Sequence, residues 1–186
     1  MKNLAAVVVF ATASFAAQSA RQAGEPIPLP SPAVSTAREL WKIASDNVLA
    51  AAQQMPEANY DFKPTPDVRS FGQIIGHVTN GQQLLCGMAL GQAPTEKTAT
   101  SKAELVAGLE ASIALCGKAY AMSDAESFKP LSAAAQKAWK ANGFGDPKTQ
   151  LFALMMNAWH DNEHYGNIVT YMRLKGMVPP SSQPRK

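Results

Sequence analysis

Four long segments of the chain carry apolar residues at helical spacing, and residues that start or stop helices bound each segment. Two of them begin with the capping-box patterns S-F-G-Q and S-K-A-E, at Ser70 and Ser101, in which both side chains satisfy free backbone amides. No segment shows the alternating apolar pattern of a half-buried strand. The sequence therefore predicts an all-α protein arranged as a four-helix bundle.

The other helix boundaries follow from caps and prolines. The first predicted helix starts at Thr36, because T-A-R-E places a glutamate three residues after a hydroxyl cap, and Pro56 ends it. The last helix is expected to start at Asp146, which is followed by proline, and to end near Lys175. A weaker pattern over residues 131–141 predicts a short extra helix before the last long one.

Residues 1–20 have the form of a secretory signal peptide. Lys2 is followed by an apolar run over residues 4–17, and no acidic residue occurs before Glu25. The run is short for a membrane span, so we expect cleavage between Ala16 and Ala20 and no stable span afterwards, a retained anchor being the alternative. The mature protein is therefore expected to be exported, to the periplasm or the medium.

A proline-rich stretch separates this signal from the predicted domain. Residues 24–32 contain four prolines, which disfavour helix and predict an extended linker over residues 21–34. The helical domain is expected to cover residues 35–182, with a tail at residues 183–186. One domain suits a chain of 186 residues.

The charge of the chain gives no indication of a nucleic-acid partner. Removing Lys2 with the signal leaves 16 basic against 14 acidic residues, a net charge near +2. The basic residues are scattered and do not alternate with aromatic ones, so no surface is predicted to follow a phosphate backbone.

Histidine occurs at three positions only, and all three lie on predicted inward helix faces. His77 lies on the apolar face of the second helix, while His160 and His164 are one turn apart on the last. At 100° per residue, Asn157 and Asn167 share the same seam of that helix within about 60° of His160. Buried polar groups need a reason, and a metal held by three imidazoles supplies one, with the asparagines binding imidazole N–H groups or water.

The same helix phases predict where the other polar residues of the last helix lie. Asp161 and Glu163 fall off the histidine seam, so we expect both on a solvated or inter-helix flank, with Glu163 the candidate for a catalytic base or an extra ligand. Tyr171 falls on the seam and is expected to direct its hydroxyl toward the site. The alternative is that the histidines are ordinary core residues, as a lone buried histidine usually is.

Two extended motifs resemble a known family. Y-D-F-K-P-T-P-D-V-R-S-F-G-Q-I-I-G-H precedes the first histidine, and H-D-N-E-H-Y-G-N-I-V-T-Y-M-R-L-K-G-M-V-P-P-S contains the other two. Together they resemble the DinB/YfiT-like family of four-helix-bundle proteins, which are regarded as metalloenzymes. The resemblance covers roughly residues 35–182. Where the family usually continues with Gly-Gln after the last histidine, this chain has Gly166-Asn167 following Tyr165, which keeps the amide on a shorter side chain.

The resemblance implies an up-down-down-up bundle with His77, His160 and His164 as ligands of one divalent metal. Family members bind ions such as zinc or nickel, and three neutral imidazoles also suit copper and iron(II). Some members transfer thiols, whereas a metal-activated water would hydrolyse a substrate, so we expect a metal-dependent transferase or hydrolase acting on a small molecule or thiol. The alternative is a non-catalytic metal- or ligand-binding bundle. The family also implies a homodimer.

The only two cysteines, Cys86 and Cys116, suggest a disulfide in an exported protein. In a simple antiparallel hairpin, their heights would differ by roughly 16 Å, which is too far to bridge. The up-down-down-up order implied by the family makes the second and third helices parallel. The cysteines, 16 and 15 residues after Ser70 and Ser101, then lie at nearly equal heights, so the resemblance implies the bridge.

Overall fold

The protein is described by a computed structural model that covers residues 31–92, 98–143, 145 and 149–184. Within these ranges it is helical, without a strand, and none of the helices is long and apolar enough to cross a bilayer. The predicted signal peptide and residues 21–30 of the predicted linker lie outside the described residues. The long helices are α1 (Pro32–Gln54), α2 (Phe71–Ala89), α3 (Lys102–Ala119) and α6 (Gln150–Leu174).

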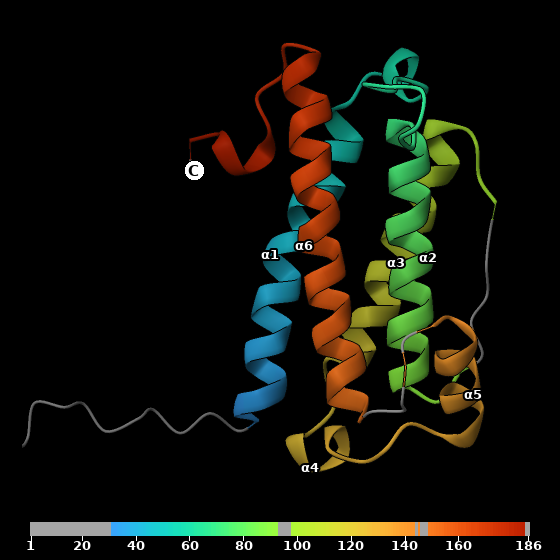
Figure 1. Cartoon of the computed structure of the whole chain (residues 1–186). Helices are drawn as coiled ribbons and strands as arrows, with labels where there is room; N and C mark the ends of the chain where they lie inside the picture. The colour runs from blue at the N-terminus through green and yellow to red at the C-terminus, as the bar shows by residue number, and fades with distance from the viewer. Residues whose placement is uncertain (1–30, 93–97, 144, 146–148, 185–186) are drawn as a thin grey trace, which may run out of the picture.

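Shorter elements join the long helices. In Figure 1, α4 (Asp124–Ser127) and α5 (Ala133–Ala141) lie at the lower end of the bundle, between the end of α3 and the start of α6. The 3-10 turns η2 (Glu57–Asn59) and η3 (Pro180–Ser182) follow α1 and α6. The helix predicted over residues 131–141 is therefore confirmed as α5, whereas α4 was not expected.

The four long helices run up, down, down and up. Figure 1 shows α1 and α6 rising side by side while α2 and α3 descend together. The main contacts join α1 to α6, α6 to α2, and α2 to α3. The predicted bundle and its helix order are confirmed, and α6 is the helix that faces both α1 and α2.

Two helices start as their capping boxes predict, and α1 does not. Ser70 and Ser101 accept hydrogen bonds from the N3 backbone amides of α2 and α3, and both reciprocal bonds are present. The predicted start of α1 at Thr36 is wrong, because the helix begins four residues earlier at Pro32, where a proline at the first position needs no amide partner. The Thr36 hydroxyl instead donates to the Pro32 carbonyl at 2.6 Å.

A carboxylate from a distant part of the chain caps α1. Asp124 accepts hydrogen bonds from the backbone amides of Ala33 and Val34, at 3.0 and 2.9 Å. It therefore satisfies two free N–H groups of the first turn and places a negative charge at the positive end of the helix. No local sequence pattern predicts this cap, because Asp124 lies 90 positions after Val34 in the sequence.

The start of α6 also differs from the prediction. Its N-cap is Thr149, whose hydroxyl accepts from the Phe152 amide at 3.2 Å, so Asp146 is not the cap. Asp146 itself lies outside the described residues. Threonine and aspartate are both good N-cap residues, so cap preference alone does not decide between Thr149 and Asp146. The Gln150 amide donates to the Lys129 carbonyl at 3.0 Å, and this bond connects the observed helix start to the preceding segment.

Cys86 and Cys116 form a disulfide between α2 and α3, with their Cα atoms 5.1 Å apart. The parallel descent of the two helices brings the cysteines to the same height (Figure 1). The bond is fully buried and closes a loop across 30 positions of sequence. It fixes the height of α2 relative to α3, nine positions after His77 along α2.

The apolar core is divided into two clusters, one toward each end of the bundle. One is centred on Trp41, Tyr120 and Trp139, and the other on Phe71, Ile75 and Met172. Fully or almost fully buried polar side chains belong to neither cluster: Gln82, Ser112, Asn157, Asp161 and His164. The histidines lie in this polar layer.

Candidate metal centre

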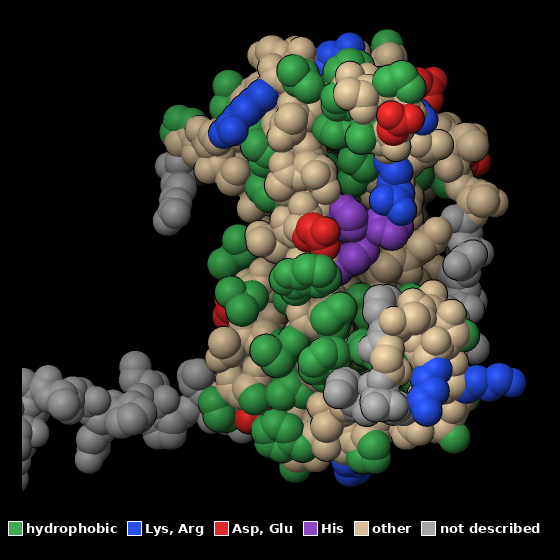
Figure 2. All heavy atoms as spheres, in the orientation of Figure 1, with side chains coloured by type: hydrophobic (Ala, Val, Ile, Leu, Met, Phe, Trp, Pro, Cys, Tyr) green, Lys and Arg blue, Asp and Glu red, His purple; other side chains and the backbone are tan. Residues whose placement is uncertain are grey.

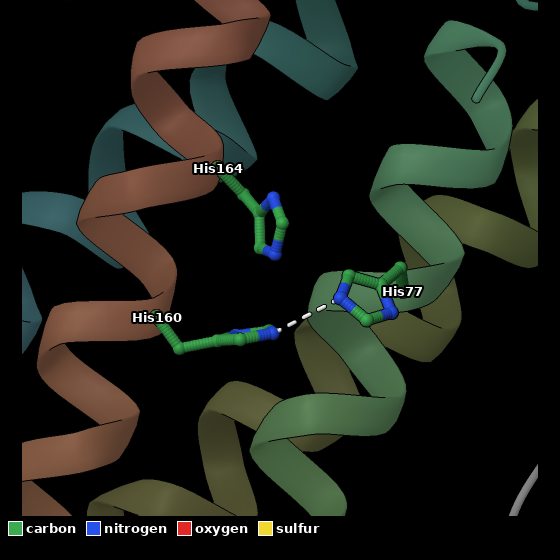
Figure 3. Close-up of side chains that lie close together, drawn as sticks. All are labelled: His77, His160 and His164. Carbon is green, nitrogen blue, oxygen red and sulfur yellow. Dashed lines mark hydrogen bonds between the residues drawn. The ribbon is translucent and has the colours of Figure 1, made fainter. Parts of the chain in front are cut away.

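The three histidines converge from two helices. His77 comes from α2, while His160 and His164 come from consecutive turns of α6, and Figure 3 shows the rings turned toward one another. The Nε2 atoms of His77 and His160 are 3.1 Å apart, and one nitrogen of each ring lies within 4.8 Å of the others. The ring centroids are 4.4–4.9 Å apart. The helix phases therefore predicted the correct three partners for a cluster.

Gly81 makes room for the cluster. It lies one turn after His77 on α2, directly under the ring of His160. A Cβ atom at position 81 would lie 2.9 Å from Nδ1 and 3.2 Å from Nε2 of His160, and closer still to Cε1. Only glycine allows the imidazole to approach the α2 backbone this closely, so the residue determines where His160 can be.

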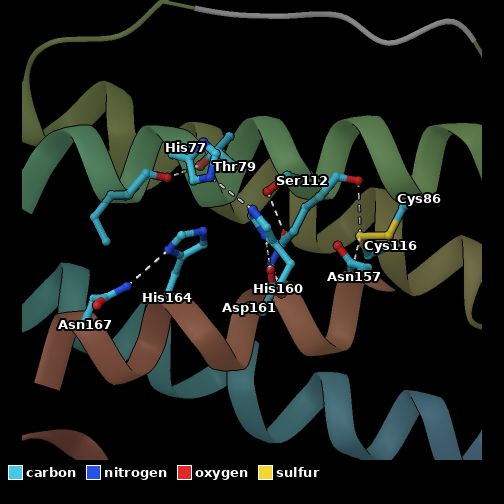
Figure 4. Close-up of polar contacts among 12 residues, drawn as sticks. His77, Thr79, Cys86, Ser112, Cys116, Asn157, His160, Asp161, His164 and Asn167 are labelled. Atoms are coloured by element: carbon cyan, nitrogen blue, oxygen red, sulfur yellow. Dashed lines mark hydrogen bonds and ion pairs between the residues drawn. A yellow bond between two sulfur atoms is a disulfide. The ribbon is translucent and has the colours of Figure 1, made fainter. Parts of the chain in front are cut away.

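Asp161 is buried behind His160 and is held by a hydrogen-bonded chain (Figure 4). Its Oδ2 accepts from Nε2 of Gln82 at 2.7 Å, and Oε1 of Gln82 accepts from the Ser112 hydroxyl at 2.8 Å. The chain crosses the bundle from α6 through α2 to α3. Of the two expected positions for Asp161, the inter-helix flank is correct and the solvated flank is wrong, since the residue is fully buried and bonds a residue of α2.

The second oxygen of Asp161 faces the histidine. Its Oδ1 atom is 3.7 Å from Nδ1 of His160, and both atoms are buried without a hydrogen-bond partner. A carboxylate behind the outer ring nitrogen is the usual support of a metal-binding histidine, because it fixes the tautomer and raises the basicity of the inner nitrogen. Asp161 therefore occupies the supporting position that the sequence reasoning had given to asparagine.

The surroundings keep the imidazoles of His77 and His164 neutral. Burial lowers the pKa of His77 to about 4, and the positive charges of Arg69, His160 and His164 act in the same direction. Burial also lowers the pKa of His164 to about 4, followed by the charges of His160 and Arg69. Burial raises the pKa of Asp161, while the nearby His160 ring and the hydrogen bond from Gln82 oppose that rise. Neutral imidazoles keep their lone pairs free near pH 7.

The predicted supporting residues lie in three different places. Nδ2 of Asn167 is 3.5 Å from Nδ1 of His164, beside the cluster. Asn157 lies away from the histidines, where its Nδ2 approaches the Tyr120 hydroxyl at 3.3 Å and Sγ of Cys116 at 3.7 Å. Its supporting role is therefore wrong, because the residue lies a turn below His160 and is buried against the disulfide.

Tyr171 also differs from the expectation. Its hydroxyl donates to the backbone carbonyl of Arg69 at 2.6 Å and so does not point at the cluster. Glu163 is exposed and makes no hydrogen bond or ion pair with a described residue. Its side chain lies on the exposed side of the helix turns that carry the histidines.

Sequence reasoning missed the residues behind the cluster, namely Asp161, Gln82, Ser112 and the close approach at Gly81. One signal was present: Gln82 belongs to a polar run, T-N-G-Q-Q at residues 79–83, in the middle of α2. Long amides in the buried part of a bundle helix require polar partners, and the partner of Gln82 is Asp161.

The residues present fit a metal ion. Two nitrogen ligands 2.0–2.1 Å from one tetrahedral zinc ion lie about 3.3–3.4 Å apart, close to the 3.1 Å between the Nε2 atoms of His77 and His160. The unpartnered pair of His160 Nδ1 and Asp161 Oδ1 has the arrangement that supports a ligated imidazole. Three histidines leave coordination positions open for water or a substrate atom.

The cluster is accessible from outside. Figure 2 shows it reaching the surface, with a Lys or Arg side chain directly beside it. His77 lines a pocket of about 540 Å³, whose described lining also includes Arg69, Asp61 and Asn80. A pocket of this size suits a small molecule rather than a macromolecular partner.

Comparison with known proteins gives a family match and several similar folds. The DinB superfamily profile matches residues 40–168. A DinB-like protein from Bacillus cereus is similar with a TM-score of 0.63 and 15% identity, covering 77% of this chain and 93% of that one. The DinB-like protein YjoA from Bacillus subtilis gives a TM-score of 0.61 and 19% identity, covering 84% of this chain and 100% of that one.

A conserved protein from Enterococcus faecalis is similar with a TM-score of 0.56 and 18% identity, covering 75% of this chain and 95% of that one. At these identities the likeness concerns the fold. No curated protein matches the sequence significantly.

Proposed function

The chain belongs to the DinB superfamily, and from this membership and its convergent histidines we propose that it holds one divalent metal ion through His77, His160 and His164. Zinc and nickel are the favoured ions, and iron is an acceptable one, because neutral imidazole suits all three. The single observation that carries the proposal is the convergence of the three ring nitrogens, supported from behind by Asp161.

The protein is proposed to be a metal-dependent enzyme that acts on a small molecule, by thiol transfer or by hydrolysis. A bound ion would lower the pKa of a coordinated thiol or water and so supply a nucleophile near neutral pH. Asp161 would hold His160 in position, and Glu163 would accept a proton on the exposed side. The pocket that reaches His77 favours catalysis over a closed, non-catalytic metal site.

Export of the protein remains a proposal as well. It is based on the charged and apolar pattern of residues 1–20. The buried Cys86–Cys116 disulfide supports it, since such bonds persist mainly in oxidising compartments. An intact mass beginning between residues 17 and 21 in protein recovered from the periplasm or medium is expected, and full-length protein confined to the cytoplasm would contradict export.

Metal analysis of tag-free protein, purified without a nickel column, tests the metal site. We expect close to one equivalent of metal in the wild type and in the control Asn162→Ala, which alters an exposed residue of α6. His160→Ala should lose the ion while keeping its helical circular dichroism. Wild-type protein that neither retains nor takes up a divalent metal would refute the site and leave the histidines as ordinary core residues.

Turnover separates an enzyme from a metal-holding protein. The metal-loaded protein should either consume an electrophile in the presence of a low-molecular-weight thiol or hydrolyse an activated ester. Either activity should be lost in His160→Ala and reduced in Glu163→Gln. Stoichiometric metal without turnover in either assay favours the non-catalytic alternative. The homodimer implied by the family remains a separate prediction, which light scattering can test.

A further inference from the structure

The pocket beside His77 contains a cation with no partner in the described part of the chain. Arg69 is the only Lys or Arg in the described lining, and its guanidinium makes no hydrogen bond or ion pair with a described residue. Figure 2 shows a Lys or Arg side chain against the histidines. Unpaired arginines are common on surfaces, but this one lies at the entrance to a candidate metal centre.

The backbone of Arg69 is fixed even though its side chain is exposed. Its carbonyl accepts the 2.6 Å hydrogen bond from Tyr171 of α6, and the next residue, Ser70, is the buried N-cap of α2. The guanidinium therefore extends from an anchored position between the helices that carry the histidines. Its positive charge contributes to lowering the pKa of both His77 and His164, so the guanidinium lies close enough to interact electrostatically with the cluster.

The charges of the pocket favour a monoanionic ligand group. Asp61 also lines the pocket and is exposed, yet it makes no ion pair with Arg69. One cation with one carboxylate nearby accommodates a single negative charge better than a dianion. The first amides of α2 add no anion site, since Phe62, Tyr60 and Ser70 already accept their hydrogen bonds. A planar guanidinium matches a carboxylate with two parallel hydrogen bonds.

We infer that this pocket binds a carboxylate-bearing small molecule, whose carboxylate pairs with Arg69 while a second donor atom reaches the open side of the three-histidine site. The inference depends on the proposed metal site and names the class of molecule that the site acts on. Arg69 is therefore a substrate-positioning residue, which explains why an arginine lies at the entrance without an internal partner.

Cobalt-loaded protein provides a test that does not require turnover. Cobalt(II) absorption reports both metal loading and the approach of a thiol to the ion. The probes are 3-mercaptopropionate, which carries a carboxylate, and 2-mercaptoethanol, which is neutral and similar in length. In the wild type, we expect mercaptopropionate to have a dissociation constant roughly tenfold lower than that of mercaptoethanol, which is the effect of one charge-assisted contact.

Three variants separate the role of Arg69 from general charge. In Arg69→Gln, the ratio of the dissociation constants of the two thiols should fall to the ratio that they show with free cobalt(II). Arg69→Lys should keep part of the preference for mercaptopropionate. Lys63→Gln, which removes the same charge from an exposed position of the same loop outside the pocket lining, should leave the preference unchanged. The preference should also fall with added salt.

The outcomes distinguish this inference from the proposed function. Normal cobalt spectra with an equal preference in the wild type and Arg69→Gln would overturn the role of Arg69 and leave the metal site standing. Equal losses in Arg69→Gln and Lys63→Gln would overturn it too, because only net charge would matter. Absence of cobalt binding by the wild type would overturn both proposals.

Discussion

Substitution of Gly81 by alanine should separate metal binding from folding. The added Cβ would lie 2.9 Å from Nδ1 of His160 and 3.2 Å from Nε2, whereas ordinary contacts are at least 3.4 Å. The ring must therefore retreat by about half an ångström at Nδ1, and by more at Cε1. Metal–ligand distances tolerate deviations of only about 0.2 Å, so this shift removes His160 from a shared ion.

Gly81→Ala should weaken metal binding but should leave the stability of the metal-free fold almost unchanged. Loss of a supporting group alone weakens metal binding about 10- to 100-fold, and displacement of a ligand should cost at least as much. Alanine is favoured over glycine inside a helix by about 0.8–1.0 kcal/mol, which offsets the crowding in the metal-free protein. We therefore expect Gly81→Ala to bind zinc at least tenfold more weakly while its metal-free melting temperature stays within a few degrees of the wild type.

Competition with a chromophoric chelator measures the zinc affinity, and circular dichroism of chelator-treated protein measures the melting temperature. Gly87→Ala is the matched control, because it lies on the same helix and its added Cβ would meet only the Gln92 carbonyl at 3.8 Å. Wild-type zinc affinity in Gly81→Ala would refute the reasoning. So would an equal loss of affinity in both variants.

Three further predictions follow from the cluster and the disulfide. Asp161→Asn should weaken zinc binding about 10- to 100-fold, because an amide whose oxygen keeps the hydrogen bond from Gln82 presents an NH2 group, and no negative charge, to Nδ1 of His160. Unchanged affinity in a chelator competition would contradict the supporting role. The pKa values of about 4 for His77 and His164, against 6.5 normally, mean that the unfolded chain binds more protons between those pH values. Metal-free protein should therefore have its full stability above pH 6.5 and lose stability as the pH falls toward 4. Between pH 7 and 5, its melting temperature should drop more than that of the double variant His77→Gln/His164→Gln. Equal drops in the two proteins would argue against neutral histidines. Removing the disulfide by Cys86→Ala/Cys116→Ala should lower the free energy of unfolding by about 3–4 kcal/mol in urea titrations, from the entropy of a loop spanning 30 positions, and a change below 1 kcal/mol would show that the bridge adds little.

The local parts of the fold were predictable because their signals are local. The boxes at Ser70 and Ser101 specify a helix start within four residues, since both hydrogen-bond partners are inside the motif. The same reasoning failed at Thr36, where an equally good motif lies inside the helix. The α1 terminus is instead stabilised by Asp124, so the position of the start depends on a contact between distant segments.

In the candidate site, too, the local features were predictable and the contacts between distant segments were not. Helix phase alone brought His160 and His164 to one face and turned His77 inward, because 100° per residue is a property of any α-helix. It left open whether Asp161 faces solvent or a neighbouring helix, because a helix that packs between two others is buried over a wider arc than one seam. Contact with α2 places that carboxylate opposite Gln82 and converts an expected flank residue into the support of His160.

The sequence by itself determined the helices, their inward faces and the three histidines, since propensity, capping and periodicity act over a few residues. Only the tertiary structure decided which partners those faces meet. The descent of α2 and α3 in parallel places Cys86 beside Cys116, and the approach of α6 to Gly81 sets His160 against His77. These outcomes depend on helix order and relative height, which arise from long-range packing and are not encoded in any single segment.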